Sequence, residues 1–207
     1  MSEDTETTSR QYWDARYREG ERLWSGEPNA ALIAETAETQ PGTALDLGCG
    51  EGADAVWLAR QGWRVVAVDV SAVALERARS HADEAGMADR VDFQRHDLGS
   101  SFPEGSFDLV AALFLHSWKD MPREEILRTA ASRVAPGGTL LIVGHVGDPV
   151  WVEELGAHVE LPTSAQVLAW LEPDERQWEI LVSEERERAH ASPGGHRADS
   201  IVKLRRR

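Results

Sequence analysis

The chain has 207 residues, enough for one sizeable core and too few for two ordinary domains. Lys and Arg total 22 against 36 for Asp and Glu, a formal net charge of −14, so the chain would repel a nucleic-acid backbone overall. No apolar run approaches the roughly 18 residues of a membrane span. We therefore expect a single domain over 1–207 with no nucleic-acid and no membrane partner. A polar start unlike a signal peptide and one cysteine make a cytoplasmic location the default expectation.

The N-terminal part changes from a polar tail to a helical pattern. We expect residues 1–8 to be disordered, 9–40 to form a helical segment, and 41–207 to form the core. Trp13 and Tyr17 are four residues apart, so they share one face of the predicted helix. That face either pins the helix to the sheet or contacts a ligand, and the sequence leaves both interpretations open.

The segment from Ala44 to Gly52 is the most informative part of the sequence. An apolar run carries Asp46 near its end, and it is followed by glycines at alternating positions and then by a helical pattern. This order predicts a buried strand, a tight turn where backbone lies against a ligand, and a helix that begins beneath it. Glycine suits such a turn because it has no Cβ and readily adopts positive φ. We expect this loop to bind a nucleotide-like molecule.

Two cofactors compete for the glycine loop. Gly48, Gly50 and Ala53 satisfy the dinucleotide fingerprint, in which a helix N-terminus binds a pyrophosphate. Three acidic residues crowd the same turn. They are Asp46, Glu51 and Asp54. Negative charge there would repel a pyrophosphate but suits the ammonium and sulfonium groups of S-adenosylmethionine (SAM), so the local charge favours SAM over NAD.

Two further acidic residues follow predicted strands. The strand pattern of residues 64–69 ends at Asp69, about 20 residues beyond the first glycine. A carboxylate there can accept hydrogen bonds from both ribose hydroxyls, in NAD folds as well, so Asp69 does not discriminate between the cofactors. Residues 91–95 alternate as a third strand and lead to Asp97, whose carboxylate could accept from the exocyclic amine of an adenine.

The rest of the chain alternates helical and strand patterns and ends in a hairpin pattern. The helical patterns cover 52–60, 71–84 with Ser71 as N-cap, 122 to a Pro-Gly-Gly break at 136–138, and 163–171 with a capping box at Thr163 and Gln166. The remaining strand patterns cover 106–110, 139–143, 178–182 and 200–204. Together they predict an α/β fold with a Rossmann-like, doubly wound sheet of seven strands, mostly parallel with one antiparallel C-terminal strand.

With these residues the chain resembles the class I S-adenosylmethionine-dependent methyltransferases, most strongly from Ala44 to Asp69. In that family the glycine loop packs against the methionine part of the cofactor, the acid after the second strand binds ribose, and an Asp after the third contacts adenine. The resemblance implies SAM as cofactor, S-adenosylhomocysteine (SAH) as its product, and a cofactor site at four strand ends. Its residues are Asp46, Gly48, Cys49, Gly50, Gly52, Asp69, Val70, Asp97, Leu98 and Leu113.

The resemblance also implies a lid and an acceptor rim. Family members often fold helices that precede the first strand over the cofactor, which expels water. Trp13, Tyr17 and Trp24 are the candidates for this lid, and an aromatic face can contact a sulfonium. Trp118 follows the fourth strand and is expected at the rim where the methyl acceptor lies.

Two histidines are candidates for chemistry. His116 follows the fourth predicted strand and His145 follows the fifth, so both should lie on the functional edge of the sheet. Either imidazole could accept a proton from an attacking hydroxyl or amine. The alternative is that each hydrogen-bonds a loop or the cofactor. Cys49 is interpreted as a compact apolar residue of the loop, and no Cys/His spacing typical of zinc is present, so we expect no metal.

The sequence narrows the acceptor only by elimination. It lacks the Asn/Asp-Pro-Pro-aromatic motif of amino-group DNA methylation after the fourth strand, and it lacks a Pro-Cys nucleophile for cytosine C5. Small-molecule acceptors remain, and 146–162 is expected to line their site. Residues 13–17 and 24–26 are similar to the compact tellurite-resistance, thiopurine and thiol methyltransferase branch.

Two other functions stay open at this stage. One is a non-catalytic SAM-binding sensor or scaffold, since fold does not fix function. The other, more remote, is an NAD-dependent oxidoreductase. The sequence does not identify the acceptor, the need for a base or the oligomeric state.

Overall fold

The computed structural model describes residues 8–116, 121–146, 161–188 and 198–207. Its strands are β1 (Thr43–Leu47), β2 (Arg64–Asp69), β3 (Val91–Arg95), β4 (Phe107–Leu113), β5 (Val134–His145), β6 (Trp178–Glu187) and β7 (Ala198–Arg206). Its helices are α1 (Ser9–Arg18), α2 (Ala30–Thr36), α3 (Ala53–Arg60), α4 (Ala72–Glu84), α5 (Arg123–Ser132) and α7 (Ser164–Leu171), with a 3-10 turn η1 (Ala88–Arg90). Each predicted helix and strand in these ranges has a counterpart, but β4, β6 and β7 run beyond their predicted ends, the N-terminal segment forms two separate helices, and the end of α5 differs as described below.

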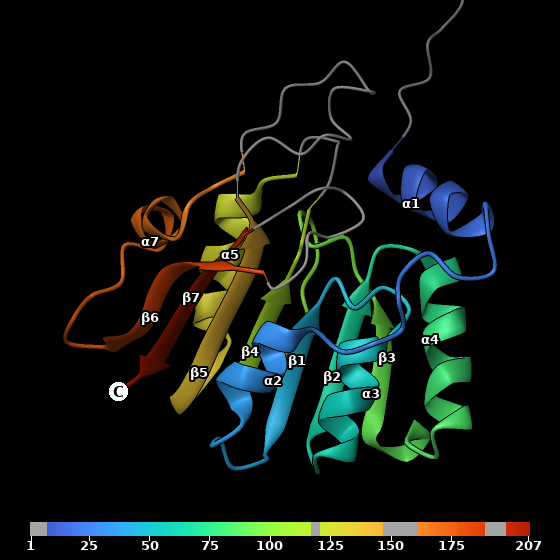
Figure 1. Cartoon of the computed structure of the whole chain (residues 1–207), viewed down its shortest axis with the longest axis horizontal. Coiled ribbons are helices and arrows are strands. Elements are labelled where there is room, and N and C mark those ends of the chain that lie inside the picture. Colours follow the sequence, from blue (N-terminus) through green and yellow to red (C-terminus); the bar gives the residue numbers. More distant parts are fainter. Residues whose placement is uncertain (1–7, 117–120, 147–160, 189–197) are drawn as a thin grey trace, which may run out of the picture.

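The seven strands form one sheet in the order β3-β2-β1-β4-β5-β7-β6 (Figure 1). The pairs from β3 through β5 are parallel, and β7 is antiparallel to both of its neighbours, β5 and β6. The prediction of a mostly parallel seven-stranded sheet with one antiparallel C-terminal strand is therefore confirmed.

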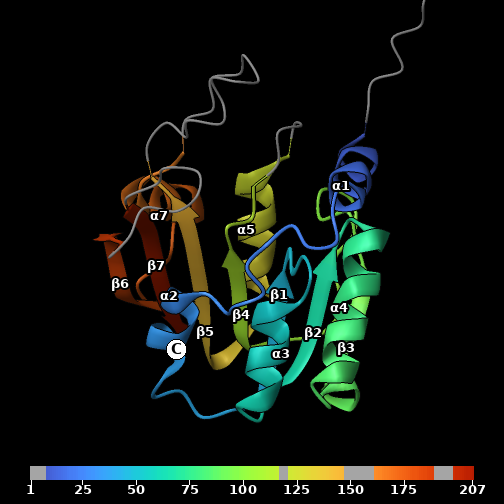
Figure 2. The same cartoon turned by 45° about the vertical axis from the view of Figure 1, so that its right-hand side comes forward.

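Helices cover both faces of the sheet, as expected of a doubly wound fold (Figure 2). Leu32 of α2, Leu58 of α3 and Leu75 of α4 are buried in one core on one face. Leu127 of α5 and Val167 of α7 are buried in a second core on the other face. None of the helices in the described part of the chain is long and apolar enough to cross a bilayer.

Local signals in the sequence explain where several helices begin. The Ser71 hydroxyl accepts a hydrogen bond from the Ala74 N–H at 3.2 Å and caps α4. Thr163 and Gln166 form the predicted capping box of α7. Gly52 caps α3 with φ at 84°, a left-handed conformation that residues with a side chain rarely adopt. These caps fix the helix starts beside the carboxyl ends of the strands.

One boundary differs from the sequence prediction. The Pro-Gly-Gly segment at 136–138 was expected to end a helix, but α5 ends at Ser132 and β5 already begins at Val134. Phe107 pairs with Val134 whereas Leu109 pairs with Thr139, so the segment forms a bulge within the strand. Pairing with β4 outweighs the apolar helical pattern here. In the strand, the backbone N–H and C=O groups of this segment can hydrogen-bond to β4, whereas at the end of a longer helix some of them would have no partner.

Replacing Gly138 by Ala should destabilise the fold. An added Cβ would lie 2.9 Å from the Ala135 carbonyl oxygen and 3.0 Å from those of Asp108 and Phe107, and backbone atoms in a sheet cannot move aside cheaply. We expect Gly138→Ala to lower the free energy of unfolding by about 1–3 kcal/mol in urea titrations. The matched control is Gly20→Ala, whose Cβ would meet only the Arg22 carbonyl oxygen at 3.8 Å. Equal urea midpoints for the two variants would contradict the assigned packing.

Candidate functional site

The carboxyl ends of the parallel strands meet at one edge of the sheet, the upper edge in Figure 1. The glycine loop follows β1, Asp69 ends β2, His116 follows β4, and His145 ends β5. Helix α1 lies above the same edge (Figures 1 and 2). This is where open α/β sheets bind ligands, and the predicted site residues that the structure describes gather there.

The glycine loop is folded back onto β2. Gly48, Gly50 and Gly52 all have positive φ, at 76°, 52° and 84°. The N–H groups of Gly48 and Cys49 both donate to the Val68 carbonyl oxygen, at 2.8 and 2.9 Å. Because these donors are used inside the protein, they are not presented to a pyrophosphate in the way that the dinucleotide fingerprint requires.

Asp69 holds the glycine loop and the start of α4 together. Its Oδ2 accepts from the Gly50 N–H at 2.9 Å and its Oδ1 accepts from the Ser71 N–H at 2.8 Å. Burial raises the pKa of Asp69, and these backbone hydrogen bonds act against that rise. A carboxylate oxygen has a second lone-pair site, so each can still accept from one ribose hydroxyl.

Asp46 is a buried carboxyl group beneath the loop. The residue is 2% exposed, and its Oδ2 has no hydrogen-bond partner among the described residues. Burial, followed by the nearby charges of Asp54 and Asp69, raises the pKa of Asp46 well above its ordinary value. An unsatisfied buried carboxylate is costly, and a cationic ligand group would relieve that cost. Asp46 therefore fits the ammonium of a bound SAM.

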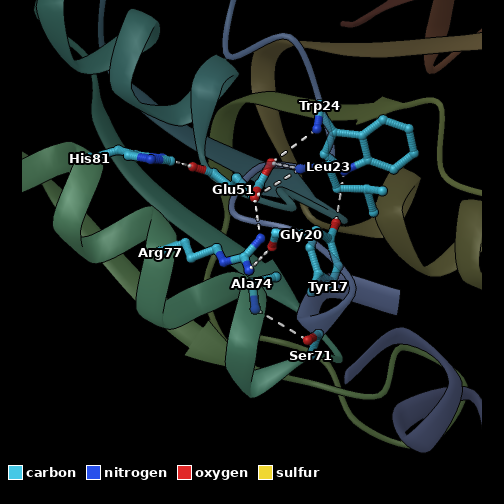
Figure 3. Close-up of polar contacts among 9 residues, drawn as sticks. All are labelled: Tyr17, Gly20, Leu23, Trp24, Glu51, Ser71, Ala74, Arg77 and His81. Atoms are coloured by element: carbon cyan, nitrogen blue, oxygen red, sulfur yellow. Dashed lines mark hydrogen bonds and ion pairs between the residues drawn. The ribbon is translucent and has the colours of Figure 1, made fainter. Parts of the chain in front are cut away.

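The other two acidic residues of the turn have a different role from the one their charge suggested. Glu51 accepts from the backbone N–H groups of Leu23 and Trp24, each at 3.1 Å, and pairs with Arg77 at 2.8 Å (Figure 3). Asp54 accepts from the Asn29 N–H at 2.7 Å. Both carboxylates thus bind the preceding chain segment instead of facing a ligand, and this part of the sequence argument for SAM was wrong.

We call residues 8–29 the N-terminal strap. Besides the contacts of Glu51 and Asp54, its Asp14 accepts from the Ser71 hydroxyl at 2.7 Å, which joins α1 to the start of α4. Arg77 also donates to the Gly20 carbonyl oxygen (Figure 3). The sequence analysis missed these contacts, since no local pattern indicates pairing between positions so far apart in the chain.

The aromatic residues of the strap lie on the glycine loop. Trp24 Nε1 donates to the Tyr17 hydroxyl at 2.9 Å (Figure 3), and a Cβ on Gly50 would lie 2.9 Å from that hydroxyl. Tyr17 is 3% exposed whereas Trp24 is 52% exposed. Trp13 is half-buried, with its ring 6.1 Å from that of Tyr17. The Tyr17 hydroxyl therefore occupies the space that a side chain at position 50 would need, which explains the glycine there.

The predicted adenine side of the site is more open. Asp97 is exposed, and its Oδ1 accepts from the Gly99 N–H at 3.2 Å in a turn after β3. Val70 and Leu98 are half-buried, and Leu113 is buried at the end of β4. An exposed carboxylate and two half-buried apolar residues at this edge are compatible with an adenine.

Cys49 belongs to the glycine loop, and its thiol has no catalytic role. Burial raises the pKa of Cys49, so its thiol stays protonated and is not a nucleophile. No group of three or more His, Cys, Asp or Glu residues suited to a metal occurs in the described ranges. Trp118 and most of the predicted acceptor lining at 146–162 lie outside the described residues.

The two histidines lie close together at the ends of β4 and β5. The His116 and His145 rings stack with centroids 5.4 Å apart, and the Phe114 ring lies 4.5 Å from His145. Phe114 itself has a φ of 51°, a strained conformation for a bulky residue and one often found at functional sites. The structure thus brings together both predicted catalytic candidates.

Asp199 is a neighbour of His145 that the sequence analysis missed. Its Oδ1 lies 3.5 Å from His145 Nδ1, and Arg188 donates to both carboxylate oxygens at 2.8–2.9 Å. Burial would raise the pKa of Asp199, but His145 and Arg188 hold it below its ordinary value, so it stays ionised. The pairing follows from strand register, since His145 of β5 faces Asp199 of β7, and a strand register is not visible in the sequence alone.

Comparisons with known proteins agree with this geometry. A family model described as a methyltransferase domain matches residues 44–138. A probable tocopherol O-methyltransferase from Oryza sativa subsp. japonica is 36% identical over 116 residues, 55% of this chain and 32% of that protein. A solved structure from a study of the conversion of a disulfide bond into a thioacetal group during echinomycin biosynthesis has a TM-score of 0.72 and 27% identity, covering 95% of this chain and 92% of that one. Residues 44–138 belong to this methyltransferase domain family, and the seven-stranded sheet has the fold of the class I S-adenosylmethionine-dependent methyltransferases.

Membership of this methyltransferase family makes SAM its cofactor and sets NAD aside. The family does not identify the methyl acceptor. A ribosomal RNA small subunit methyltransferase C from Alcanivorax borkumensis is 31% identical over 145 residues, 65% of this chain and 44% of that protein. The methyltransferase spans less than half the length of either curated relative named here.

Removing the Glu51 carboxylate should loosen the strap of this methyltransferase without unfolding its core. Glu51→Ala removes the acceptor of the Leu23 and Trp24 N–H groups and the ion-pair partner of Arg77. We expect the free energy of strap opening, measured by hydrogen exchange over residues 14–29, to fall by about 1–3 kcal/mol. The control is Glu19→Ala, which removes only an exposed pair with Arg16 and should leave exchange unchanged. Equal exchange in both variants would refute the fastening role of Glu51.

Proposed function

We propose that this protein transfers a methyl group from SAM to a small-molecule acceptor. The observation that carries the proposal is the buried Oδ2 of Asp46, which has no partner among the described residues and lies under a glycine loop whose Gly48 and Cys49 N–H groups are already used. That arrangement suits a cationic amino-acid group joined to a ribose. When bound, SAM supplies a methyl group on a sulfonium, which is already an activated electrophile.

The cofactor would be held at the ends of three strands. Asp46 would accept from the ammonium of the methionine part, and Asp69 would accept from the ribose hydroxyls with the lone pairs that Gly50 and Ser71 leave. Asp97 would accept from the adenine amine, with Val70 and Leu98 against the ring. Each role is carried over from the family pattern, and the positions of these residues support it.

The N-terminal strap would act as the lid over the core, within a single domain. Tyr17 and Trp24 already lie on Gly50, so a bound cofactor would be sheltered from water on that side. Methyl transfer is an in-line displacement that depends mainly on alignment and desolvation, and alignment can contribute roughly 7–11 kcal/mol at best. A strap fastened by three carboxylates is suited to this task.

His145 is the favoured base for a neutral hydroxyl or amine acceptor. The ionised Asp199 lies at its Nδ1, which favours the tautomer with the proton on Nδ1 and makes Nε2 the basic nitrogen. His116 stacks on the same ring and would contact the acceptor or its proton. A thiolate or an oxyanion acceptor would need no base.

The small-molecule assignment rests on charge. A net charge of −14 disfavours an RNA backbone, although a relative is named for ribosomal RNA methylation. The proposed cytoplasmic location rests instead on the polar start and the single cysteine. The branch of tellurite-resistance, thiopurine and thiol methyltransferases stays a prediction from residues 13–17 and 24–26. A SAM-binding scaffold without turnover is the competing function that experiment must separate.

Binding measurements can separate the two acidic contacts. We expect SAH to bind in calorimetric titrations and NAD not to bind. Asp46→Asn should weaken SAH about tenfold to a hundredfold, the range for a hydrogen bond to a charged group, but leave 5′-methylthioadenosine, which lacks the amino-acid part, unchanged. Asp69→Asn should weaken both ligands, and Asp92→Asn, at an exposed site on β3, should weaken neither.

The pH dependence has a definite direction. Because the pKa of Asp46 is raised, this carboxyl group takes up a proton at higher pH than an ordinary Asp, and only its ionised form attracts an ammonium. SAH affinity relative to that of 5′-methylthioadenosine should therefore fall as the pH is lowered, and Asp46→Asn should abolish the difference. Loss of 5′-methylthioadenosine binding in Asp46→Asn would contradict the assigned contact.

Turnover separates an enzyme from a scaffold. Release of SAH from SAM, measured against a panel of small hydroxyl, amine and thiol compounds, should identify at least one acceptor. With a hydroxyl or amine acceptor, His145→Gln should lower kcat by about 10²–10⁴ and leave the SAH dissociation constant within about twofold. Unchanged kcat would exclude His145 as the base, and SAH binding without any turnover across the panel would favour the scaffold.

A further inference from the structure

Arg123 carries a charge that no carboxylate of the described residues neutralises. It is the first residue of α5, the helix that follows β4 in the chain, and its Nε is buried without a hydrogen-bond partner among the described residues. No carboxylate of the described residues forms an ion pair with its guanidinium. Burial lowers the pKa of Arg123 to about 10, so the side chain stays protonated near neutral pH. Arg188 differs, because Asp199 accepts from it through both oxygens.

A glycine on β5 makes room for this guanidinium. A Cβ on Gly144 would lie 3.1 Å from an Arg123 terminal nitrogen, 3.3 Å from the Ser200 hydroxyl and 3.7 Å from His116 Cε1. Arg123, Ser200 and His116 therefore converge on one point above the strand. They are polar, they come from three different segments, and the missing side chain leaves them mutually accessible.

This cluster lies beside the cofactor loop on the acceptor side. Leu115, next to His116, packs on the glycine loop, since its Cδ1 would lie 2.7 Å from a Cβ on Gly48. The loop follows β1, and the cluster lies at the ends of β4 and β5, the next two strands in the sheet. Neighbouring strands are about 5 Å apart, so the cluster is within the reach of a small molecule from the glycine loop.

The local charge favours an anionic ligand. Asp199 is neutralised by Arg188, so no described carboxylate is left to compensate the Arg123 charge, although the net charge of the chain is −14. Burying a charge without a counter-ion destabilises a protein, so an arginine in this position is best explained by a partner that arrives with the ligand. A guanidinium presents paired N–H donors that match carboxylate and phosphate oxygens.

We propose that Arg123 binds an oxyanion group of the methyl acceptor, a carboxylate or a phosphate, and thereby selects anionic small molecules as substrates. The inference rests on the proposed function and deepens it. Ser200 and His116 would complete the oxyanion site, and the acceptor atom would then lie between this site and the glycine loop, within reach of His145. Arg123 is a specificity residue and takes no part in moving a proton.

The test uses the full chain saturated with SAH and simple anions as probes. Binding of benzoate, of its neutral counterpart benzamide and of inorganic phosphate is measured by calorimetry. Arg123→Gln removes the charge, Arg123→Lys keeps it without the paired donors, and Arg128→Gln removes an exposed arginine from the same helix as the matched control. The SAH dissociation constant and the melting temperature are measured for every variant.

We expect benzoate or phosphate to bind the wild type and Arg128→Gln, and benzamide to bind neither. Arg123→Gln should weaken the anion at least tenfold, Arg123→Lys less, and the SAH dissociation constant should stay within twofold. The stronger of the two probes identifies the oxyanion. Arg123→Gln should melt at the same temperature as the wild type or higher, because it removes an uncompensated charge.

Four results would overturn the proposal. The first is that the SAH-bound wild type binds no anion, and the second is that Arg123→Gln binds the anion equally well. The third is a tenfold loss of SAH affinity in Arg123→Gln, which would assign Arg123 to the cofactor carboxylate. The fourth is a lower melting temperature of that variant, which would make the role of Arg123 structural. Failure of the wild type to bind SAH at all would instead refute the proposed function, so the two failures are distinguishable.

Discussion

The geometry of the cofactor edge depends on the two hydrogen bonds that Asp69 accepts. One fixes the glycine loop through Gly50, and the other fixes the start of α4 through Ser71. Ser71 in turn caps α4 and donates to Asp14 of the strap. A single carboxylate at the end of β2 therefore sets the relative positions of the loop, a helix and the lid, and a ligand that contacts it meets a preformed surface.

The acidic residues at this edge have two roles. Some hold the strap and the helices in place, and Asp46 is proposed to bind the ligand. Asp14, Glu51 and Asp54 accept from strap and helix groups, so their charges are already compensated by N–H donors or by Arg77. Asp46 is left with a buried oxygen that no described group satisfies. Beside the neighbouring strands the balance reverses, because Arg123 of α5 is a positive charge that no described carboxylate compensates. The proposed cofactor half of the site is thus suited to a cation, and the proposed acceptor half to an anion.

Features that depend on nearby residues could be predicted from the sequence, whereas features that depend on distant pairing could not. The glycine loop, the Ser71 cap and the capping box at Thr163 are written in adjacent positions, and the structure confirms them. The role of Glu51 was misjudged because its partners at 23 and 24 come from a separate segment. The contact of Asp199 with His145 depends on strand register. Arg123 could not be singled out from the sequence, because only the structure shows that no described carboxylate pairs with it.

The place of β7 in the sheet has a consequence for how the polypeptide folds during synthesis. β7 follows β6 in the chain yet lies between β5 and β6, so it is the only described bridge that connects β6 to the parallel strands. Until β7 has left the ribosome, β6 has no partner strand, and its Ile180 and Leu181, which are exposed even in the folded protein, have no neighbouring strand beside them. Completion of the sheet, with His145 facing Asp199, is therefore a late event that waits for the final strand to leave the exit tunnel.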